Sequence, residues 1–338
     1  MKKLGRTNFA AWQNLLETSF FVFCCLILPI KAQRLPIKTY TVADGLAHND
    51  VHRIFQDPKR FLWLATAEGL SRFDGYVFTN YGIAEGLAHI YVNDVTTDRE
   101  GNLWVATNGG GIARLLDPTA DDQPTKRATA PQKFASYSVA EGGADNKANL
   151  VNRILFDAEN RMWCATDGGL FRARRAGEIS NYNFELVAPG STPHMTNGAF
   201  ADSRGRLWFG IKNLLVRVDA GQIKIYEMPS TANSFSDFNS ILEDEHGQIL
   251  ATTSKTAYQF DEMRDEWRPF ALHAAQAIDY FKVVAPARSG GLWIGANTGL
   301  LRARAQQQTL FSIESGLPSN DVKTIFTDRE NNLWLGTA

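Results

Sequence analysis

Apolar and polar positions along this chain repeat with a period of roughly 40 to 45 residues. Each repeat contains a short apolar stretch that ends in a small residue and usually a Thr, and the successive stretches start 41, 59, 45, 42, 43 and 41 residues apart. Their central residues are Trp63, Trp104, Trp163, Trp208, Leu250, Trp293 and Trp334. Strand-like sequence with this period is typical of a β-propeller that has one blade per repeat. We therefore predict an all-β, seven-bladed β-propeller of four-stranded antiparallel blades, with the last blade incomplete.

The first predicted strand of each repeat has apolar residues three positions apart, as in Val51 and Ile54. A strand with one exposed face alternates with a period of two, so this spacing indicates strands that are covered on both faces. In most repeats an Asp follows three residues later, and a Gly or Asn follows three residues after that. This order predicts a hairpin turn that closes on a left-handed residue. Arg60 in the first repeat and Ala287 in the sixth break the pattern.

The second predicted strand carries the Trp, and the residue two positions later is small in six repeats: Ala65, Ala106, Ala165, Gly210, Gly295 and Gly336. The two positions share one face of the strand, so a small residue there lets a large side chain of the neighbouring blade approach. The third predicted strand repeats an apolar-x-Arg pattern that ends at Arg72, Arg114, Arg172, Arg217 and Arg302. We interpret these arginines as solvated or paired with nearby acids.

The last repeat supplies only two predicted strands, residues 322–327 and 333–337, before the sequence ends at Ala338. We predict that residues 36–41 act as the fourth strand of this blade and close the ring, which removes an exposed sheet edge. Because a third strand is missing, we also predict that the sequence is a fragment of a longer polypeptide.

Three repeats share a longer phrase. Residues 315–322 read Ser-Gly-Leu-Pro-Ser-Asn-Asp-Val, and residues 332–337 read Asn-Leu-Trp-Leu-Gly-Thr, with Asp328 between them. Residues 44–49 (Asp-Gly-Leu-Ala-His-Asn) and 85–87 (Glu-Gly-Leu) repeat its first part. From about residue 36 onward, the chain resembles the two-component regulator propeller repeat, least so where Ile211 and Leu250 replace Thr and Trp. The resemblance implies the extracytoplasmic sensor domain of a hybrid two-component or sensor histidine kinase-type receptor, whose output domain lies elsewhere in the same longer chain.

The charge of the chain is nearly balanced, with 35 Lys and Arg residues against 36 Asp and Glu residues. It therefore lacks the basic field of a nucleic-acid-binding protein. We expect residues 33–338 to form one propeller domain. Residues 117–132 are rich in Pro, Thr, Ala and charge, and indicate a loop insertion between the third and fourth strands of the second blade.

The N-terminal residues have a different pattern. Residues 1–32 combine Lys2, Lys3 and Arg6 with an apolar stretch over residues 20–30. This pattern predicts a signal peptide, with an uncleaved N-terminal anchor as the alternative. After cleavage Cys164 would be the single cysteine, which we interpret as a small buried hydrophobe and not as a reactive thiol.

The candidate chemistry is sparse. The six histidines show no spacing typical of a metal site, and the repeated Asp indicates turn geometry, so we expect no metal, no cofactor and no catalytic residue. The loops that enter the first strand of each blade differ most between repeats, and such loops line one rim of a propeller. A local hydrogen-bonding role is the simplest interpretation of each residue there. As the alternative, we predict ligand contacts at His48, Asn49, His89 and Tyr91.

Several classes of function remain open. The first is a periplasmic or otherwise extracytoplasmic sensor that binds a small-molecule or carbohydrate ligand and passes the signal to an output domain. The second is a secreted propeller enzyme of the lactonase, lyase or glycosidase type, and the third is a protein-binding scaffold without signalling. The regular repeats and the family resemblance favour the sensor. A homodimer is left open as a further partner arrangement.

Overall fold

The computed structural model describes residues 36–116, 132–142, 146–175, 179–189, 198–228, 237–272, 278, 280–304 and 307–338. The signal peptide or anchor predicted over residues 1–32 lies outside these ranges, as does all but the last residue of the predicted insertion over residues 117–132. The chain divides into a unit that ends at Pro36 and a unit over Ile37–Ala338, and the second unit contains all the strands.

Six sheets have four antiparallel strands, which follow one another in sequence order. Blade 1 is β1 (Val51–Gln56), β2 (Leu62–Thr66), β3 (Gly69–Phe73) and β4 (Phe78–Tyr81), and blade 2 is β5 (Val92–Thr97), β6 (Leu103–Thr107), β7 (Gly111–Leu115) and β8 (Phe134–Tyr137). Blade 3 is β9 (Val151–Phe156), β10 (Met162–Thr166), β11 (Gly169–Ala173) and β12 (Phe184–Pro189), and blade 4 is β13 (Ala199–Ala201), β14 (Leu207–Ile211), β15 (Leu214–Asp219) and β16 (Gln222–Glu227). Blade 5 is β17 (Ser240–Glu243), β18 (Ile249–Thr252), β19 (Ala257–Asp261) and β20 (Glu266–Phe270), and blade 6 is β21 (Phe281–Pro286), β22 (Leu292–Ala296), β23 (Leu300–Arg304) and β24 (Gln307–Phe311).

The sequence predicted seven blades, and the structure corrects this number to six. At the seventh position, β25 (Val322–Thr327) and β26 (Leu333–Thr337) form a two-stranded sheet. The reason is that only the first two strands of the last repeat lie within the sequence. The prediction of four-stranded antiparallel blades holds for the other six sheets.

The predicted fourth strand over residues 36–41 does not form, and no described residue of this segment pairs with β26. Tyr40 nevertheless stacks on Trp334, with ring centroids 5.9 Å apart. Tyr81, at the end of the fourth strand of blade 1, stacks on Trp63 in the same way at 5.7 Å. The segment thus supplies the aromatic side chain of a fourth strand without its backbone hydrogen bonds, because no third strand lies between it and β26.

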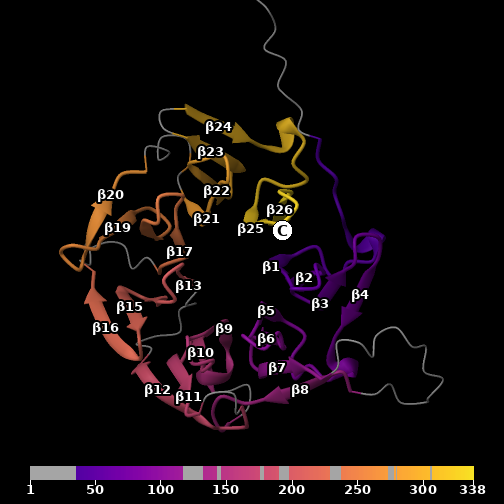
Figure 1. Ribbon diagram of the computed structural model, residues 1–338. Coiled ribbons are helices and arrows are strands. Elements are labelled where there is room, and N and C mark those ends of the chain that lie inside the picture. Colours follow the sequence, from indigo (N-terminus) through magenta and orange to yellow (C-terminus); the bar gives the residue numbers. More distant parts are fainter. Residues whose placement is uncertain are drawn as a thin grey trace, which may run out of the picture. The chain divides into compact units, whose positions relative to one another are not determined.

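The first strand of each sheet lies innermost. Figure 1 shows β1, β5, β9, β13, β17, β21 and β25 nearest the centre of the ring, and the fourth strand of each blade at its outside. Each inner strand contacts the inner strands on either side of it, from β1 through β25 and back to β1. The ring therefore closes by packing between sheets, although the seventh sheet is short.

The spacing of three apolar residues in the inner strands arises from a β-bulge. Val51 lies opposite Thr66 and Arg53 lies opposite Ala65, so His52 is an extra residue in the register of β1 and β2. The same shift occurs in β5, β9, β21 and β25. A bulge bends its strand and redirects one side chain. The bulged residues are all polar: His52, Asn93, Asn152, Lys282 and Lys323.

The repeated Asp connects the first turn of a blade to its Trp. In blade 3, Oδ1 of Asp157 accepts the backbone N–H of Arg161 at 2.8 Å, and Oδ2 accepts the indole N–H of Trp163 at 3.0 Å. The same Asp–Trp hydrogen bond forms in Asp57–Trp63, Asp98–Trp104, Asp202–Trp208 and Asp328–Trp334. The predicted left-handed residue is confirmed, since φ is 61° at Asn160 and 69° at Asn331. Arg60, which breaks the sequence pattern, adopts the same conformation with φ of 74°.

The small residue after the Trp faces the next inner strand. A Cβ on Gly295 would lie 2.8 Å from Cγ1 of Val322 and 3.0 Å from its carbonyl oxygen. The neighbour is thus the first residue of the next blade's inner strand, which explains why the position must be small. Cys164 is fully buried, as predicted, and burial raises the pKa of its thiol.

The arginines of the third strands have a role that the sequence did not indicate. Four of the guanidinium groups lie over the Trp of the second strand, at 5.4 Å for Arg172 over Trp163 and 5.0 Å for Arg302 over Trp293. The fifth, that of Arg72, lies over Phe61 beside β2. A cation over an aromatic face is attracted by the electrons of the ring. Arg172 also pairs with Glu185, so the predicted pairing with acids describes part of its environment.

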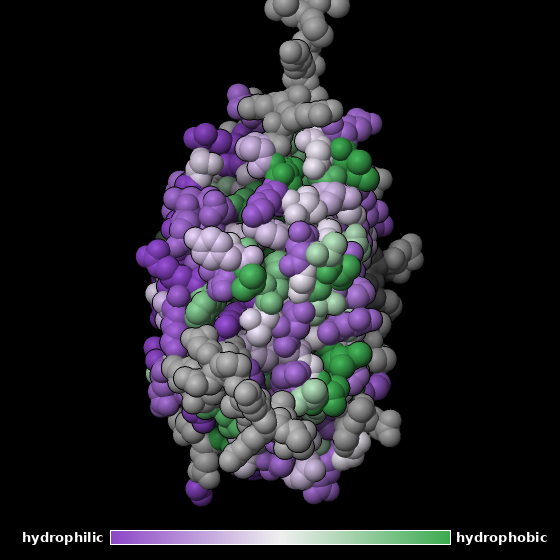
Figure 2. All heavy atoms as spheres, turned by 90° about the vertical axis from the view of Figure 1, so that its right-hand side faces the viewer, coloured by the Kyte–Doolittle hydropathy of each residue, from purple (hydrophilic) through white to green (hydrophobic). Residues whose placement is uncertain are grey.

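The side of the ring that carries β4 is mostly hydrophilic (Figure 2). Val42, Ile83 and Ile313 each begin a short 3₁₀ turn, in η1 (Val42–Asp44), η2 (Ile83–Glu85) and η7 (Ile313–Ser315), and are 52%, 55% and 57% exposed. Viewed from the β4 side, apolar residues form small separate groups among hydrophilic ones (Figure 2). Within the described part of the chain, every helix is too short or too polar to cross a membrane.

Candidate ligand site at the centre of the ring

Two of the four predicted ligand contacts are histidines that shape their own loops. Nδ1 of His48 accepts the backbone N–H of Asp50 at 3.0 Å, and Nδ1 of His89 accepts that of Tyr91 at 3.1 Å. In the last repeat, Oγ of Ser319 accepts the equivalent N–H at 3.1 Å. The shared geometry supports the local role, and ligand contact by either histidine stays a prediction.

Asn49 and Tyr91, the other two predicted contacts, differ from each other. Oδ1 of Asn49 accepts the backbone N–H of Val42 at 2.9 Å, which holds the start of η1. Tyr91 stacks on His52, with ring centroids 4.6 Å apart and ring planes 29° apart. The structure therefore brings Tyr91 together with a residue that sequence reasoning did not select.

Three of the bulged residues on the inner strands bond to the next blade. Nζ of Lys323 donates to Oδ1 of Asp50 at 2.7 Å, and Lys282 makes the equivalent ion pair with Asp321. Nδ2 of Asn93 donates to the carbonyl oxygen of Val151 at 2.9 Å. Each contact joins one blade to the next, so these bulged side chains connect neighbouring blades.

Within the described part of the chain, His52 makes no such bond to the next blade, and neither does Asn152, whose Nδ2 donates to Oδ1 of Asp167 in its own blade at 2.8 Å. His52 occupies the same position as Lys323, yet its contact with the next blade is the ring stack on Tyr91. Its Nε2 is buried and has no hydrogen-bond partner among the described residues. A buried polar atom without a partner costs free energy in the absence of a water or ligand that satisfies it.

A charged group lies next to His52 on the same inner strands. Oδ1 of Asp94 is 3.3 Å from Nε of Arg53 and 3.7 Å from Nη1 of Arg153. Oδ2 of Asp94 accepts the backbone N–H of Ile154 at 3.0 Å. Oγ of Ser240 in blade 5 accepts the backbone N–H of Val284 in blade 6 in the same way. Asp94 therefore connects blade 2 to blade 3 through one oxygen and binds two arginines through the other.

We call these convergent residues the axial cluster: Asp50, His52, Arg53, Tyr91, Asp94, Arg153 and Lys323. They come from four repeats, on or next to the inner strands β1, β5, β9 and β25 that Figure 1 shows at the centre. Besides Nε2 of His52, Nε of Arg53 and Oδ1 of Asp94 are buried without a hydrogen bond. Nε of Arg53 and Oδ1 of Asp94 face each other as an ion pair, which leaves Nε2 of His52 as the buried atom of the cluster without a polar partner among the described residues. Because such atoms are rare in folded proteins, its surroundings are the candidate ligand site.

The pKa shifts describe the electrostatics of the axial cluster. The pKa of His52 is lowered by its burial and by the nearby cations Lys323 and Arg153, although Asp50 acts in the opposite direction. His52 is therefore neutral at pH 7. Burial lowers the pKa of Arg153 to about 10, which leaves it charged, and burial also raises the pKa of Tyr91.

Sequence reasoning missed most of this site. The signal was present, because the position after the first apolar residue of the inner strand is polar in six repeats: His52, Asn93, Asn152, Asn239, Lys282 and Lys323. A period-based interpretation treats such a residue as one more position on a covered strand. Only the bulge shows that it faces the next blade.

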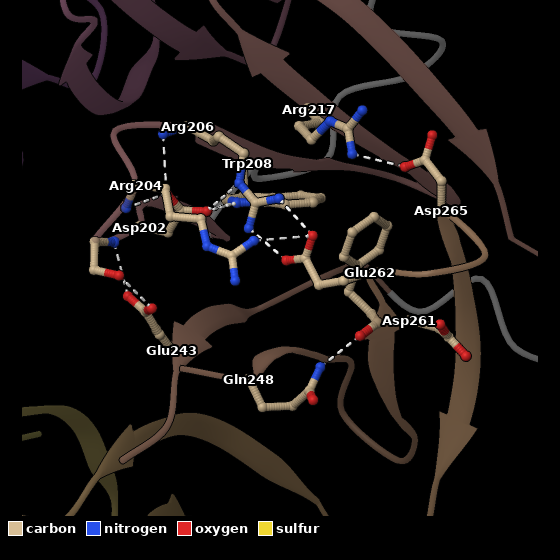
Figure 3. Close-up of polar contacts among 12 residues, drawn as sticks. Asp202, Arg204, Arg206, Trp208, Arg217, Glu243, Gln248, Asp261, Glu262 and Asp265 are labelled. Atoms are coloured by element: carbon tan, nitrogen blue, oxygen red, sulfur yellow. Dashed lines mark hydrogen bonds and ion pairs between the residues drawn. The ribbon is translucent and has the colours of Figure 1, made fainter. Parts of the chain in front are cut away.

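A second polar cluster joins blades 4 and 5 (Figure 3). The guanidinium of Arg206 binds Oδ2 of Asp202 at 2.6 Å and Oε1 of Glu262 at 2.7 Å. Arg217 on β15 binds Asp265, in the turn between β19 and β20, at 2.7 Å. Because each of these carboxylates already has a cationic partner, we interpret the cluster as a clamp between blades.

Because its carboxylates must be ionised, this cluster should make the fold less stable in acid. Hydrogen bonds from Lys224 and Tyr226 lower the pKa of Asp265 to about 2, with burial acting the other way, and hydrogen bonding to Arg206 lowers the pKa of Glu262. A carboxylate whose pKa is lowered by folding stabilises the fold above its unfolded pKa, here 3.8 for Asp265, and this contribution is lost as the pH falls towards 2. We expect the urea midpoint to fall between pH 4 and pH 2.

The variant Asp265→Asn should make this decline shallower, because Asn cannot ionise and tolerates the positive φ of 53° at this position. Urea titrations at several pH values measure the effect, with Asp219→Asn at the exposed end of β15 as the control. An identical decline in Asp265→Asn and in the unmodified chain would contradict the prediction.

The comparisons with known proteins agree with the repeat pattern. Residues 86–109 and 316–338 match the two component regulator propeller family. A stretch of 71 residues is 37% identical to histidine kinase P4 of Formosa agariphila, and covers 20% of this chain and 5% of that protein. These matches identify two-component regulator propeller repeats in this chain.

Solved structures share the fold. The extracellular domain of a putative hybrid two component system from B. thetaiotaomicron has a TM-score of 0.66 at 23% identity, over 89% of this chain and 40% of that one. Virginiamycin B lyase from Staphylococcus aureus has a TM-score of 0.62 at 15% identity, over 86% of this chain and 92% of that one. At these identities the likeness establishes the propeller and leaves the activity open. The chain spans less than half of the sensor domain that it resembles.

Proposed function

We propose that this chain, which carries two-component regulator propeller repeats, is the ligand-sensing propeller of an extracytoplasmic signal-transduction receptor. Its ligand is a small solute or carbohydrate, bound at the axial cluster, and an output domain in the same longer protein receives the signal. The family match and the likeness to an extracellular sensor domain support the class of function.

The observation that carries the location is the break in the repeat at His52. The bulged residues Asn93, Lys282 and Lys323 end in a hydrogen bond or ion pair with the next blade, whereas His52 leaves Nε2 buried without a partner among the described residues. A ligand that satisfies this atom touches Tyr91 of blade 2 and lies beside the Lys323–Asp50 pair of the seventh sheet. Binding there bridges three successive repeats, which couples the ligand to the packing between blades.

The axial cluster favours a sensor over a hydrolytic enzyme. Glycoside hydrolysis uses two carboxyl groups that face the scissile bond. Here Asp50 is paired with Lys323, and Asp94 is held between Arg53 and Arg153. Among the described residues, no group of three or more His, Cys, Asp or Glu side chains has the arrangement of a metal site. We therefore expect the bound compound to be recovered unchanged.

The double variant His52→Ala with Tyr91→Ala tests the location. We expect isothermal titration against a panel of small metabolites and oligosaccharides to find a ligand for the unmodified chain, and binding to fall by about a hundredfold in the double variant. The matched control is His246→Ala, because His246 is an 80% exposed imidazole in the turn between β17 and β18. Full binding in the double variant, together with loss in His246→Ala, would place the site at the opposite rim.

A further inference from the structure

The axial cluster holds more positive than negative charge. Asp50 and Lys323 neutralise each other as an ion pair at 2.7 Å. Asp94 is the one acid between Arg53 and Arg153, and its second oxygen is already used by the backbone N–H of Ile154. With His52 neutral, the cluster has a formal charge of +1: three cations (Arg53, Arg153 and Lys323) against two carboxylates (Asp50 and Asp94).

Arg53 is the cation that is open to a ligand. Its Nε is 3.3 Å from Oδ1 of Asp94, and its side chain is 41% exposed. Within the described residues, its two Nη groups donate no hydrogen bond, whereas Nη1 of Arg153 donates to the carbonyl oxygen of Asn93 at 3.3 Å. A guanidinium with both Nη groups available presents the planar fork that binds a carboxylate through two parallel hydrogen bonds.

The surroundings of His52 support the same ligand chemistry. Burial is the main cause of its lowered pKa, and among the neighbouring charges Asp50 acts against Lys323, Arg153 and His48. The formal charge of +1 on the cluster favours an anion over a further cation. A neutral sugar has fewer binding partners here, because one face of Tyr91 is stacked on His52 and both carboxylates are paired with cations.

We infer that the ligand carries a carboxylate, bound by the two Nη groups of Arg53 and adjacent to Nε2 of His52. The inference rests on the proposed function and narrows its ligand to small acidic solutes such as sugar acids.

Matched pairs of compounds test this inference. The probes are galacturonate with galactose, glucuronate with glucose, and galactose 6-sulfate, each titrated calorimetrically into the unmodified chain at low and at moderate salt. We expect at least one sugar acid to bind about tenfold or more tightly than its neutral partner, with an affinity that falls as salt rises.

Arg53→Gln should remove this preference for the acid, and so should Arg53→Lys, which keeps the charge but not the fork. Arg204→Gln is the matched control, because Arg204 is a 59% exposed arginine between β13 and β14. Melting curves check that each variant is folded. If Arg53→Gln does not fold, Arg53→Lys is used for the test.

Each other outcome overturns the inference. Equal affinity for the acid and the neutral sugar, with loss of binding in the His52→Ala and Tyr91→Ala double variant, would contradict the requirement for a carboxylate. The proposed function would still hold. Binding of galactose 6-sulfate alone would assign a sulfate instead. Binding of a sugar acid that survives in both Arg53 variants would place the anion elsewhere, and no binding of any probe would count against a sugar acid as the ligand.

Discussion

Replacing Asp157 by Ala is expected to lower the free energy of unfolding by about 3 kcal/mol. The carboxylate is buried and accepts hydrogen bonds from the indole of Trp163 and the backbone N–H groups of Glu159 and Arg161. It also binds Nε of Arg161 at 3.0 Å. Alanine removes all of these contacts and leaves the indole N–H of a fully buried Trp without an acceptor. Urea denaturation followed by tryptophan fluorescence measures the change.

Blade 5 offers a natural control for the contribution of the indole. There Leu250 replaces the Trp, and Asp244 accepts only the backbone N–H groups of His246 and Gln248, at 2.8 and 2.9 Å. We expect Asp244→Ala to cost about 1 kcal/mol, because it removes turn contacts alone. Equal losses in the two variants would show that the Asp–Trp hydrogen bond does not stabilise the fold.

Adding a third and fourth strand to the seventh sheet is expected to raise the melting midpoint by several degrees. Trp334 and Leu335 on β26 are only half-buried, whereas the corresponding residues Trp63 and Leu64 on β2 are buried. Thr66 also donates to the carbonyl oxygen of Gly69 on the third strand at 2.8 Å, a partner that no described residue supplies to Thr337. A strand paired with β26 would supply both the cover and the acceptor, and would remove a free sheet edge.

A segment of blade 1 can supply the two added strands. Ala338 corresponds to Ala67, so a copy of residues 68–80 placed after Ala338 continues the repeat in register. The copy ends before Tyr81, which leaves Tyr40 its place on Trp334. The control is the same extension with Leu70→Asp in the copied segment, since Leu70 is fully buried in blade 1. Equal melting midpoints for the extended and the unextended chain would contradict the prediction.

The sequence by itself determined the propeller, the strands of each blade and the turns between them. These features are local: a Trp, a small residue two positions later and an Asp–Gly or Asp–Asn turn recur with one period, and each acts on neighbours within its own repeat or the next. The same locality led to the count of seven blades, because a period counts repeats and not the strands that each one completes. It also hid the bulge, which changes the register by a single residue.

Only the tertiary structure decided which polar residues meet. Asp50 and Lys323 are 273 residues apart in the sequence and form an ion pair because the ring brings the first and last repeats together. Arg53, Asp94 and Arg153 belong to three different repeats, and no one of them differs visibly from an ordinary surface charge in the sequence. His48 and Asn49 stood out as variable loop residues, yet they form local hydrogen bonds, whereas Nε2 of His52 on the inner strand β1 is buried without a partner among the described residues. Closure of the ring places the inner strands side by side, and this contact between distant repeats cannot be inferred from a pattern that repeats every blade.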